Sequence, residues 1–366
     1  MGDKVREIAI KFREREKSCR IIPCDDSALA KFLKRQNASS YAIVCDSTTK
    51  RLFGEKLKKK LLAEKLKAGL FSFPAGEKSK NLATVEKLMD EMLSKGIDRK
   101  SMVIALGGGV AGDVAGFVAS CYMRGIPYVQ VPTTLLAMVD SSIGGKTGVD
   151  LKNGKNSCGA FYQPKAVFMN VSYLEKLPEK EIRNGLAECI KYGIISDKEL
   201  FYYLEENLDR IFAKDKRVLG NIVSECARIK SEVVINDEKE QNLRKILNFG
   251  HTIGHAVEAL TNYKKYSHGE AIACGMHYEL LLAEKICNFP HEEAEKARAL
   301  LERSGFEVDL PELKSKKLIE FMKKDKKNVS GKINFALPKM IGLMYRENGL
   351  YSISVNLESI KKALSQ

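Results

Sequence analysis

Three of the five histidines in this chain lie within one window of 18 residues, and their spacing points to a metal site. Imidazole is the commonest protein ligand of catalytic metals. His251 and His255 are four residues apart, so they share one face of a helix, and His268 follows a polar turn that can bring it back towards them. Glu188 interrupts an apolar helical pattern upstream. Two histidines and one glutamate form a known set of zinc ligands, although separate core and surface histidines can show the same spacing.

A glycine-rich turn forms a second candidate site. The apolar residues 102–106 run directly into Gly107-Gly108-Gly109 and the start of a helix. Glycines let the backbone approach a ligand, and free N–H groups at a helix N-terminus attract phosphate. The pattern G-G-G-x-x-G-D differs from the G-x-G-x-x-G dinucleotide motif, so a nucleotide site and an ordinary tight turn both stay open.

Polar residues also follow other apolar segments of the first half. Asp46 ends one segment, where an acidic side chain would suit a ribose, and Thr133 and Thr134 follow another. Ligands of open α/β sheets gather at the carboxyl ends of strands, although each residue alone also suits a turn or a cap. In the later glycine-rich stretch, Lys146 and the pair Lys155-Asn156 offer cations and an amide that could clamp a phosphate or carboxylate. Such a long segment is typical of a functional loop, or of a lid without ligand contacts.

The elements that must position these residues alternate in the first half of the chain. Apolar segments typical of buried strands alternate with charged or periodic segments typical of helices. The strands are expected at residues 41–46, 70–74, 102–106, 128–132 and 166–171, and the helices at 50–68 and 81–95. This alternation of strands and helices predicts a mainly parallel, Rossmann-like sheet covered by helices.

The second half has a different character. From residue 178 to about 326 nearly every segment has helical periodicity. A late hairpin is expected at 332–338 and 341–346, and a closing helix at 357–364. We therefore expect an α/β domain over residues 1–172 and an all-α domain over residues 173–366.

Composition excludes several classes of protein. Nine cysteines without a Cys-x-x-Cys pair, and an N-terminus charged from residue 3, indicate a cytoplasmic protein with reduced thiols. Residues 102–123 carry one charge, but their five glycines argue against a membrane helix. The net charge of +14 is spread over short lysine clusters without a nucleic-acid motif. We expect neither nucleic acid nor membrane as a partner.

Five blocks of this chain together resemble the 3-dehydroquinate synthase family, within the sugar-phosphate cyclase superfamily. They occur in the family's order, and the resemblance covers residues 40 to 330. The blocks are residues 107–113, 132–150, 185–191, 247–256 and 268–271.

The resemblance implies an NAD-binding N-terminal domain, a metal- and substrate-binding helical domain, and an active site in the cleft between them. The implied substrate is 3-deoxy-D-arabino-heptulosonate 7-phosphate, and the products are 3-dehydroquinate and phosphate, in the shikimate pathway. An alcohol is transiently oxidised by NAD, phosphate is eliminated, the hydride returns, and an intramolecular aldol reaction closes the ring. A divalent metal, zinc with cobalt as the alternative, polarises the substrate.

The resemblance also implies roles for individual residues. The metal ligands are Glu188, His251 and His268, which leaves His255 to assist proton transfer and phosphate binding. The other substrate-site residues are Lys146, Asn156, Lys191, Lys230, Arg244, Asn248 and either Lys326 or Lys327. The NAD-site residues are Asp46, Glu77, Lys80, Gly109, Asp113, Thr133, Thr134, Asp140 and Lys155. The family is homodimeric, and Arg124 matches an arginine that reaches the neighbouring subunit's site.

Three alternatives stay open. Another sugar-phosphate cyclase would keep the NAD and metal residues but change the substrate contacts; Lys146, Lys230, Arg244 and Asn248 argue against it. A metal- and NAD-dependent polyol dehydrogenase would release NADH and need no phosphate clamp. A basic nucleic-acid-binding protein would bind with an affinity that falls steeply with salt.

Overall fold

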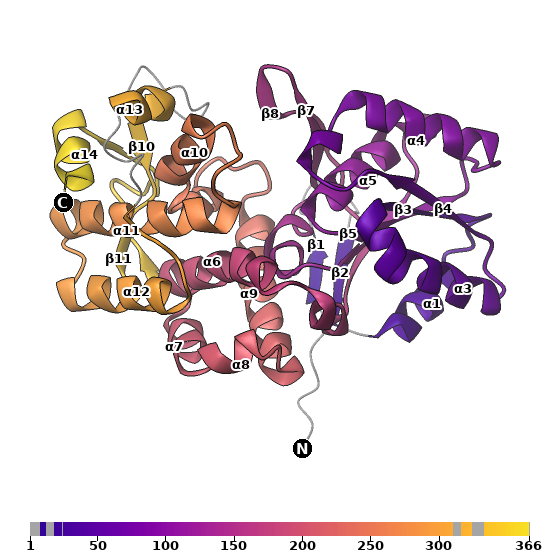
Figure 1. Cartoon of the computed structure of the whole chain (residues 1–366), viewed down its shortest axis with the longest axis horizontal. Coiled ribbons are helices and arrows are strands. Elements are labelled where there is room, and N and C mark those ends of the chain that lie inside the picture. The colour runs from indigo at the N-terminus through magenta and orange to yellow at the C-terminus, as the bar shows by residue number, and fades with distance from the viewer. Residues whose placement is uncertain (1–7, 12–17, 24, 310–315, 324–332, 366) are drawn as a thin grey trace. The chain divides into compact units, whose positions relative to one another are not determined.

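The computed structural model describes residues 8–11, 18–23, 25–309, 316–323 and 333–365 (Figure 1). The chain divides into two compact units. Unit 1 comprises Met1–Leu177 and Leu219–Ser231, and unit 2 comprises Pro178–Val218 and Glu232–Gln366. The long helix α9, Lys216–Asn236, therefore contributes its middle to unit 1 and its two ends to unit 2.

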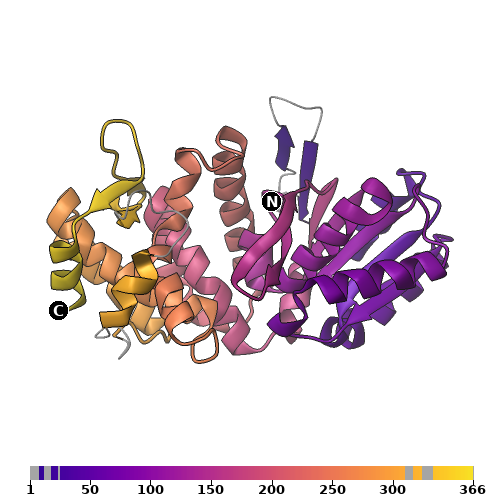
Figure 2. The same cartoon turned by 90° about the horizontal axis from the view of Figure 1, so that it is seen from above.

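Unit 1 is built on a sheet that has seven strands within the described residues, in the order β1-β2-β9-β6-β5-β3-β4. Only the edge strand β1 runs antiparallel to its neighbour, as the indigo pair in Figure 2 shows. The predicted mainly parallel, Rossmann-like sheet is confirmed. Its strands are β1 (Ile8–Lys11), β2 (Ser18–Pro23), β3 (Tyr41–Asp46), β4 (Ala68–Phe73), β5 (Met102–Gly107), β6 (Tyr128–Pro132) and β9 (Ala166–Met169).

Helices cover both faces of this sheet. In Figure 1, α4 (Leu82–Ser94) and α5 (Gly109–Cys121) lie on one side of β3 and β4, and α1 (Asp26–Lys34) and α3 (Glu55–Ala63) lie on the other. Every residue of β5 is consequently buried, as expected of a parallel strand covered on both faces.

Glycines bring α5 directly onto its neighbours. A Cβ at Gly112 would lie 2.7 Å from Oε1 of Gln130, and one at Gly116 would lie 2.5 Å from Cγ2 of Thr147. The close packing explains why the apolar segment 102–123 is glycine-rich. None of the helices in the described part of the chain is long and apolar enough to cross a membrane.

Two expectations for unit 1 are corrected. The helical segment expected at 50–68 is a π-helical turn (Lys50–Gly54), which continues the short helix α2 (Ser47–Thr49), followed by α3. α3 stops at Ala63, before a left-handed Lys65 with φ of 61°. The stretch interpreted as a loop or lid, residues 132–150, contains a helical turn at Ala137–Ser141 and ends in β7 (Lys146–Leu151), which forms an antiparallel hairpin with β8 (Gly154–Phe161). Short helical turns complete the unit at Glu77–Ser79, Tyr122–Arg124, Ala137–Ser141 and Val171–Lys176.

Unit 2 is helical, as predicted. Helix α11 packs against α6, α10, α12 and α14, so it is the central element of the unit. The helices are α6 (Glu179–Ser196), α7 (Lys198–Glu206), α8 (Leu208–Phe212), the Leu243–Asn248 turn, α10 (His251–Leu260), α11 (His268–Cys287), α12 (His291–Arg303), α13 (Lys316–Lys323) and α14 (Leu357–Leu364).

Two small sheets add to the helical unit and correct the late hairpin. β11 (Pro338–Met340) pairs with β12 (Leu343–Met344), which retains a hairpin near the expected place. β10 (Ile333–Phe335), expected in the same hairpin, pairs instead with β13 (Ile353–Val355).

Candidate functional site

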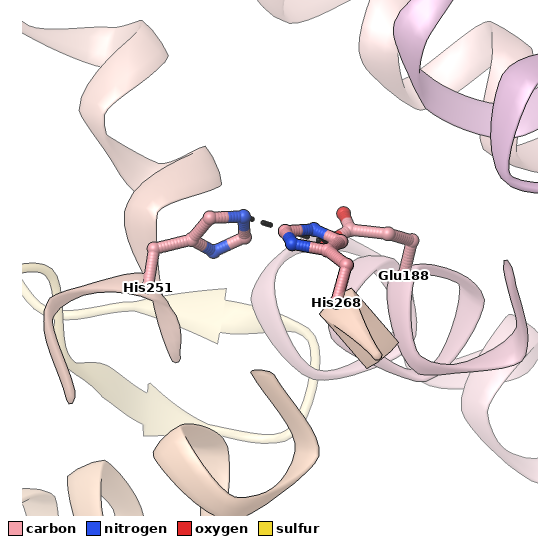
Figure 3. A group of neighbouring side chains, drawn as sticks. All are labelled: Glu188, His251 and His268. Carbon is pink, nitrogen blue, oxygen red and sulfur yellow. Dashed lines mark ion pairs between the residues drawn. The ribbon is translucent and has the colours of Figure 1, made fainter. Parts of the chain in front are cut away.

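Three helices of unit 2 bring Glu188, His251 and His268 together (Figure 3). Glu188 lies in the middle of α6, His251 is the first residue of α10, and His268 is the first residue of α11. Oε1 of Glu188 lies 3.5 Å from Nε2 of His251 and 3.4 Å from Nε2 of His268. One ligand atom from each residue lies within 4.8 Å of the others. A carboxylate oxygen and two imidazole nitrogens at this spacing fit a divalent cation such as zinc.

The second nitrogen of each imidazole has its own partner. Nδ1 of His251 lies 3.0 Å from the carbonyl oxygen of Phe249. Because a carbonyl only accepts hydrogen bonds, Nδ1 carries the proton, and Nε2 of the neutral ring is left for a metal. Nδ1 of His268 faces Oε1 of Glu258 at 3.4 Å. Partners of this kind fix the orientation of histidines that bind metals.

Local sequence explains how His268 is held. Ser267 and Glu270 form a reciprocal capping box at the start of α11. Asn184, one turn before Glu188 on α6, accepts a hydrogen bond of 2.6 Å from the N–H of Gly269. The start of α11 is thereby tied to the helix that carries Glu188.

The electrostatics of the cluster favour a positive charge between its members. Burial lowers the pKa of His268, but the Glu188 and Glu258 carboxylates outweigh this effect and raise the pKa to about 10. Glu188 is fully buried, and its other oxygen forms an ion pair with Lys191, whose Nζ also donates to the carbonyl of Leu247 at 3.0 Å.

His255 lies close to this cluster, with its ring centroid 5.0 Å from that of His251. It forms a second possible ligand group with Glu258 and His268, also within 4.8 Å. The two groups share His268. Sequence analysis missed Glu258, although His251, His255 and Glu258 follow the i, i+4, i+7 spacing of one helical face.

Arg244 and Asn248 lie in the turn before α10. The Arg244 side chain is buried, and its Nη1 donates to the carbonyl of Glu238 at 2.6 Å. Nδ2 of Asn248 donates to Oε1 of Glu240 at 2.9 Å. Glu240 has a left-handed φ of 60°, and no motif in the sequence identified it.

Asp237 shapes the loop that leads to Arg244. Its carboxylate accepts hydrogen bonds from the backbone N–H groups of Gln241, Asn242 and Arg244, at 2.8, 2.7 and 3.0 Å. Burial raises the pKa of Asp237, but these hydrogen bonds outweigh it and hold the pKa below its ordinary value. The loop thus depends on an ionised carboxylate.

In unit 1, residues expected at the NAD and phosphate sites contact one another. Nζ of Lys80 lies 2.6 Å from Oδ2 of Asp113 and 2.5 Å from Oδ1 of Asn156. Burial lowers the pKa of Lys80, but Asp113 outweighs it, so the ammonium stays charged. Nζ of Lys155 lies 3.3 Å from Glu77.

A second contact in unit 1 joins Lys230 to Asp140. Nζ of Lys230 donates to both the side chain and the carbonyl of Asp140, at 2.6 Å each. Lys230 is nearly fully buried. The carboxylate and the carbonyl of Asp140 thus hold the buried ammonium in place.

The glycine turn has the geometry of a backbone cradle. Gly107 has a φ of 150°, and a Cβ there would lie 2.6 Å from Cβ of Ala111. Gly109 begins α5, and its own Cβ would meet Ser141 at 3.2 Å. Glycine at these two positions lets the backbone pack against the side chains of Ala111 and Ser141 at the N-terminus of a 13-residue helix, and such a terminus can receive phosphate oxygens.

The remaining expected residues have more ordinary environments. Asp46 caps α2 by accepting hydrogen bonds from Thr48 and Thr49. The Thr133 N–H donates to the carbonyl of Gly107, and Thr134 Oγ1 accepts from the Ala137 N–H. Lys146 is exposed at the start of β7, and Arg124 is exposed in a left-handed turn with φ of 68°. Lys326 and Lys327 lie outside the described residues.

Two family models match consecutive parts of the chain. The model "3-dehydroquinate synthase N-terminal" matches residues 70–184, and "3-dehydroquinate synthase C-terminal" matches residues 185–328. Among curated relatives, the 3-dehydroquinate synthase of Thermoanaerobacter sp. (strain X514) is 47% identical over 331 residues, covering 90% of this chain and 91% of the relative. That of Thermodesulfovibrio yellowstonii is 44% identical over 337 residues and covers 92% of each chain.

Solved structures of related cyclases match nearly the whole chain, at lower sequence identity than the curated relatives. A 2-deoxy-scyllo-inosose synthase complexed with carbaglucose-6-phosphate, NAD+ and Co2+ has a TM-score of 0.88 and 27% identity, covering 98% of this chain and 99% of that one. A 2-epi-5-epi-valiolone synthase from Streptomyces hygroscopicus with NAD+ and Zn2+ has a TM-score of 0.86 and 28% identity, covering 97% of each. A maleylacetate reductase from Agrobacterium tumefaciens, with a TM-score of 0.66, 13% identity and 95% coverage of each chain, shares the fold alone. From the two family models and the 44–47% identity along nine-tenths of its length, this chain belongs to the 3-dehydroquinate synthase family.

Proposed function

We propose that the chain converts 3-deoxy-D-arabino-heptulosonate 7-phosphate into 3-dehydroquinate and inorganic phosphate. The observation that carries this proposal is its identity of 44–47% to 3-dehydroquinate synthases over nine-tenths of its length. The cyclases that make inosose and valiolone rings are only 27–28% identical to it. The difference favours the shikimate-pathway reaction over the other cyclisations.

The proposed cofactors are NAD and one divalent metal, zinc or cobalt. NAD would bind in the α/β domain, residues 1–172, and would take up a hydride and return it within each turnover. The metal would bind in the helical domain, residues 173–366, as a Lewis acid for the substrate's hydroxyl groups. Support comes from the ligands in the two related cyclase structures and from the converging side chains of Glu188, His251 and His268.

The chain's own residues would bind the anionic ends of the substrate. Arg244 and Lys230 suit the carboxylate, because a guanidinium can bind it in a bidentate mode and a buried ammonium adds charge. Lys146 and Asn156 suit the phosphate, and Lys191 and Asn248 suit substrate oxygens near the metal. His255 would hold a proton for the leaving phosphate, and its place one helical turn from His251 supports this role.

For the dinucleotide, the glycine cradle at Gly109 would take the pyrophosphate. The other proposed NAD residues are Asp46, Glu77, Lys80, Asp113, Thr133, Thr134, Asp140 and Lys155. The active unit would be a cytoplasmic homodimer in which Arg124 of each subunit reaches its neighbour's site. Arg124 is exposed and has a left-handed backbone conformation, and both features support a side chain that points outward to a neighbouring subunit.

The test is release of inorganic phosphate from the heptulosonate phosphate with substoichiometric NAD, with and without a chelator. We expect many turnovers per NAD, no net absorbance of NADH, and loss of activity after chelation. Accumulation of NADH with a simple polyol would instead support a polyol dehydrogenase. Turnover of other sugar phosphates in preference to the heptulosonate would support another cyclase.

A further inference from the structure

Helix α10, which begins with His251, has no local cap. The residue before it is Gly250, with a left-handed φ of 79° and no side chain that could accept a hydrogen bond. The first N–H groups of a helix have no partner within the helix and are usually satisfied by a Ser, Thr, Asp or Asn at this position. A buried helix start with glycine there needs an acceptor from elsewhere in the chain.

Glu279 of α11 supplies that acceptor. Its Oε2 accepts a hydrogen bond of 2.7 Å from the N–H of Gly250, and its Oε1 accepts one of 3.3 Å from the N–H of Ile253. Ile253 is the third residue of α10, which is the position that a local cap side chain normally serves. Glu279 is fully buried, and a carboxylate at a helix N-terminus also interacts favourably with the helix dipole.

Glu279 can contact these N–H groups only because the backbones of α10 and α11 lie directly against each other. A Cβ at Gly275 would lie 1.9 Å from the carbonyl oxygen of Gly250, and a Cβ at Gly250 would lie 2.5 Å from Cγ of Met276. Glycine at both places lets α11 pass directly beside the start of α10. Glu279 lies one turn after Gly275 on α11, so its carboxylate reaches the N–H groups of Gly250 and Ile253.

We infer that Glu279 is a positioning residue for the metal site, which caps α10 from α11 and thereby fixes the direction of His251. This inference rests on the proposed function, because it requires a metal at Glu188, His251 and His268. His251 lies between the two residues whose N–H groups Glu279 binds. The same helix α11 begins with His268, so one element sets the place of both imidazoles.

Loss of the Glu279 carboxylate has a defined consequence. Two buried N–H groups lose their acceptor, and the first turn of α10 can satisfy them only by moving. His251 moves with that turn and its Nε2 leaves the cluster. Outer partners of metal ligands typically contribute about 10–100-fold in metal affinity, and we expect an effect of this size.

The test is zinc affinity, measured on metal-free protein by competition with a chromophoric chelator. Glu279→Gln preserves the volume but keeps one acceptor oxygen, so its affinity should fall about tenfold, and that of Glu279→Ala by up to about 100-fold. The matched control is Tyr278→Phe, which removes the hydrogen bond of 2.8 Å from the neighbouring residue of α11 to Asp309. It should lower the melting temperature while the affinity stays within about twofold of wild type.

Wild-type affinity in Glu279→Gln, with wild-type hydrogen exchange at the amides of residues 250 and 253, would overturn the inference. Where Glu279→Ala does not fold, Glu279→Gln decides the question alone. An equal loss of affinity in Tyr278→Phe would also overturn it, because destabilisation of α11 alone would then explain the effect. A wild-type protein that binds no zinc would instead refute the proposed metal site itself.

Discussion

Glu188 is a fully buried carboxylate at the centre of the proposed metal site. A fully buried carboxylate is costly unless positive charge lies beside it. Lys191 forms an ion pair with one oxygen, and His251 and His268 face the other at 3.5 and 3.4 Å. The Glu188 carboxylate adds an anionic ligand to the two imidazoles, and the Lys191 ammonium offsets part of its charge.

The first prediction separates the two possible ligand groups. Glu188→Gln keeps the shape but removes the anionic ligand, so we expect the bound metal to be lost and kcat/KM to fall by more than about 1000-fold. His255→Ala should keep one metal per subunit while activity falls, because His255 belongs only to the second group. Metal content by elemental analysis and phosphate release measure both effects. Metal retained in Glu188→Gln and lost in His255→Ala would transfer the site to His255, Glu258 and His268.

Asp237 gives a pH-dependent prediction at the same scale. Its pKa is lower in the folded protein, so its hydrogen bonds contribute stability above the ordinary value of 3.8, and this contribution is lost as pH falls through the folded pKa. Asp237→Ala should lower the free energy of unfolding by about 1–2 kcal/mol at about pH 7, equally at about pH 5, and by less in stronger acid. KM should rise, because Arg244 loses its loop anchor. The measurement is urea unfolding of wild type and Asp237→Ala from neutral to acidic pH. A difference in free energy of unfolding between them that grew as pH fell would contradict the prediction.

Residue types and their spacing are enough to predict part of the candidate site. Histidines are few enough for their spacing to carry information, and spacing alone points to a metal near His251, His255 and His268, with a carboxylate available upstream at Glu188. The choice of Glu188, His251 and His268 as the ligands, with His255 left out, is what the family resemblance implies. Glu279 could not be predicted in this way, because its partners lie 29 and 26 residues earlier in the chain. Only the packing of α11 on α10 brings them together.

At the scale of elements, the interface of α10 and α11 is defined by glycine. A Cβ at Gly254 would lie 2.9 Å from the carbonyl oxygen of Ala271, and one at Gly275 would lie 1.9 Å from that of Gly250. Backbone cannot yield as a flexible side chain can. The ligand-bearing starts of the two helices are therefore held at a separation that a single methyl group would change.

Substitution by alanine should distinguish a glycine at this interface from a glycine elsewhere in a helix. Gly275→Ala should lower the free energy of unfolding by more than about 2 kcal/mol and weaken metal binding, because Gly250 must move. The matched control is Gly220→Ala in α9, where nothing lies within 4 Å of the added Cβ. That control should stabilise the protein by about 0.5–1 kcal/mol through helix propensity. Denaturant titrations measure both variants. Equal changes in the free energy of unfolding would show that close contact at Gly275 does not determine the packing of α10 and α11.

Five of the seven strands in the sheet of unit 1 could be predicted, because buried parallel strands are continuous apolar segments. β1 and β2 were not expected from the sequence, because charged residues surround these short apolar segments. β3 and β6 have the predicted bounds. The hairpin of β7 and β8 lacked that signal, because glycine, lysine and asparagine dominate it and several of its residues are exposed. β10 pairs with a strand about 20 residues away, whereas local sequence favours the nearest partner.

At the scale of the whole molecule, the proposed homodimer predicts that an Arg124 variant and an Arg244 variant complement each other. If Arg124 completes the neighbour's site, Arg124→Ala and Arg244→Ala lie in different subunits of one active site. Each variant alone should lose activity. A heterodimer of the two keeps one site with both arginines and one site with neither.

Mixing the two inactive variants under conditions that exchange subunits should therefore restore activity. Half of the dimers are then heterodimers and half of their sites are intact, so about a quarter of wild-type activity per subunit should return. An arginine that acts within its own subunit predicts no recovery, because every site then lacks one of the two side chains. The control is a mixture of Arg244→Ala with Glu188→Gln, two substitutions proposed for one site of one subunit, which should stay inactive. Size-exclusion chromatography of differently tagged subunits confirms that exchange has taken place, so that absence of recovery would count against the shared site.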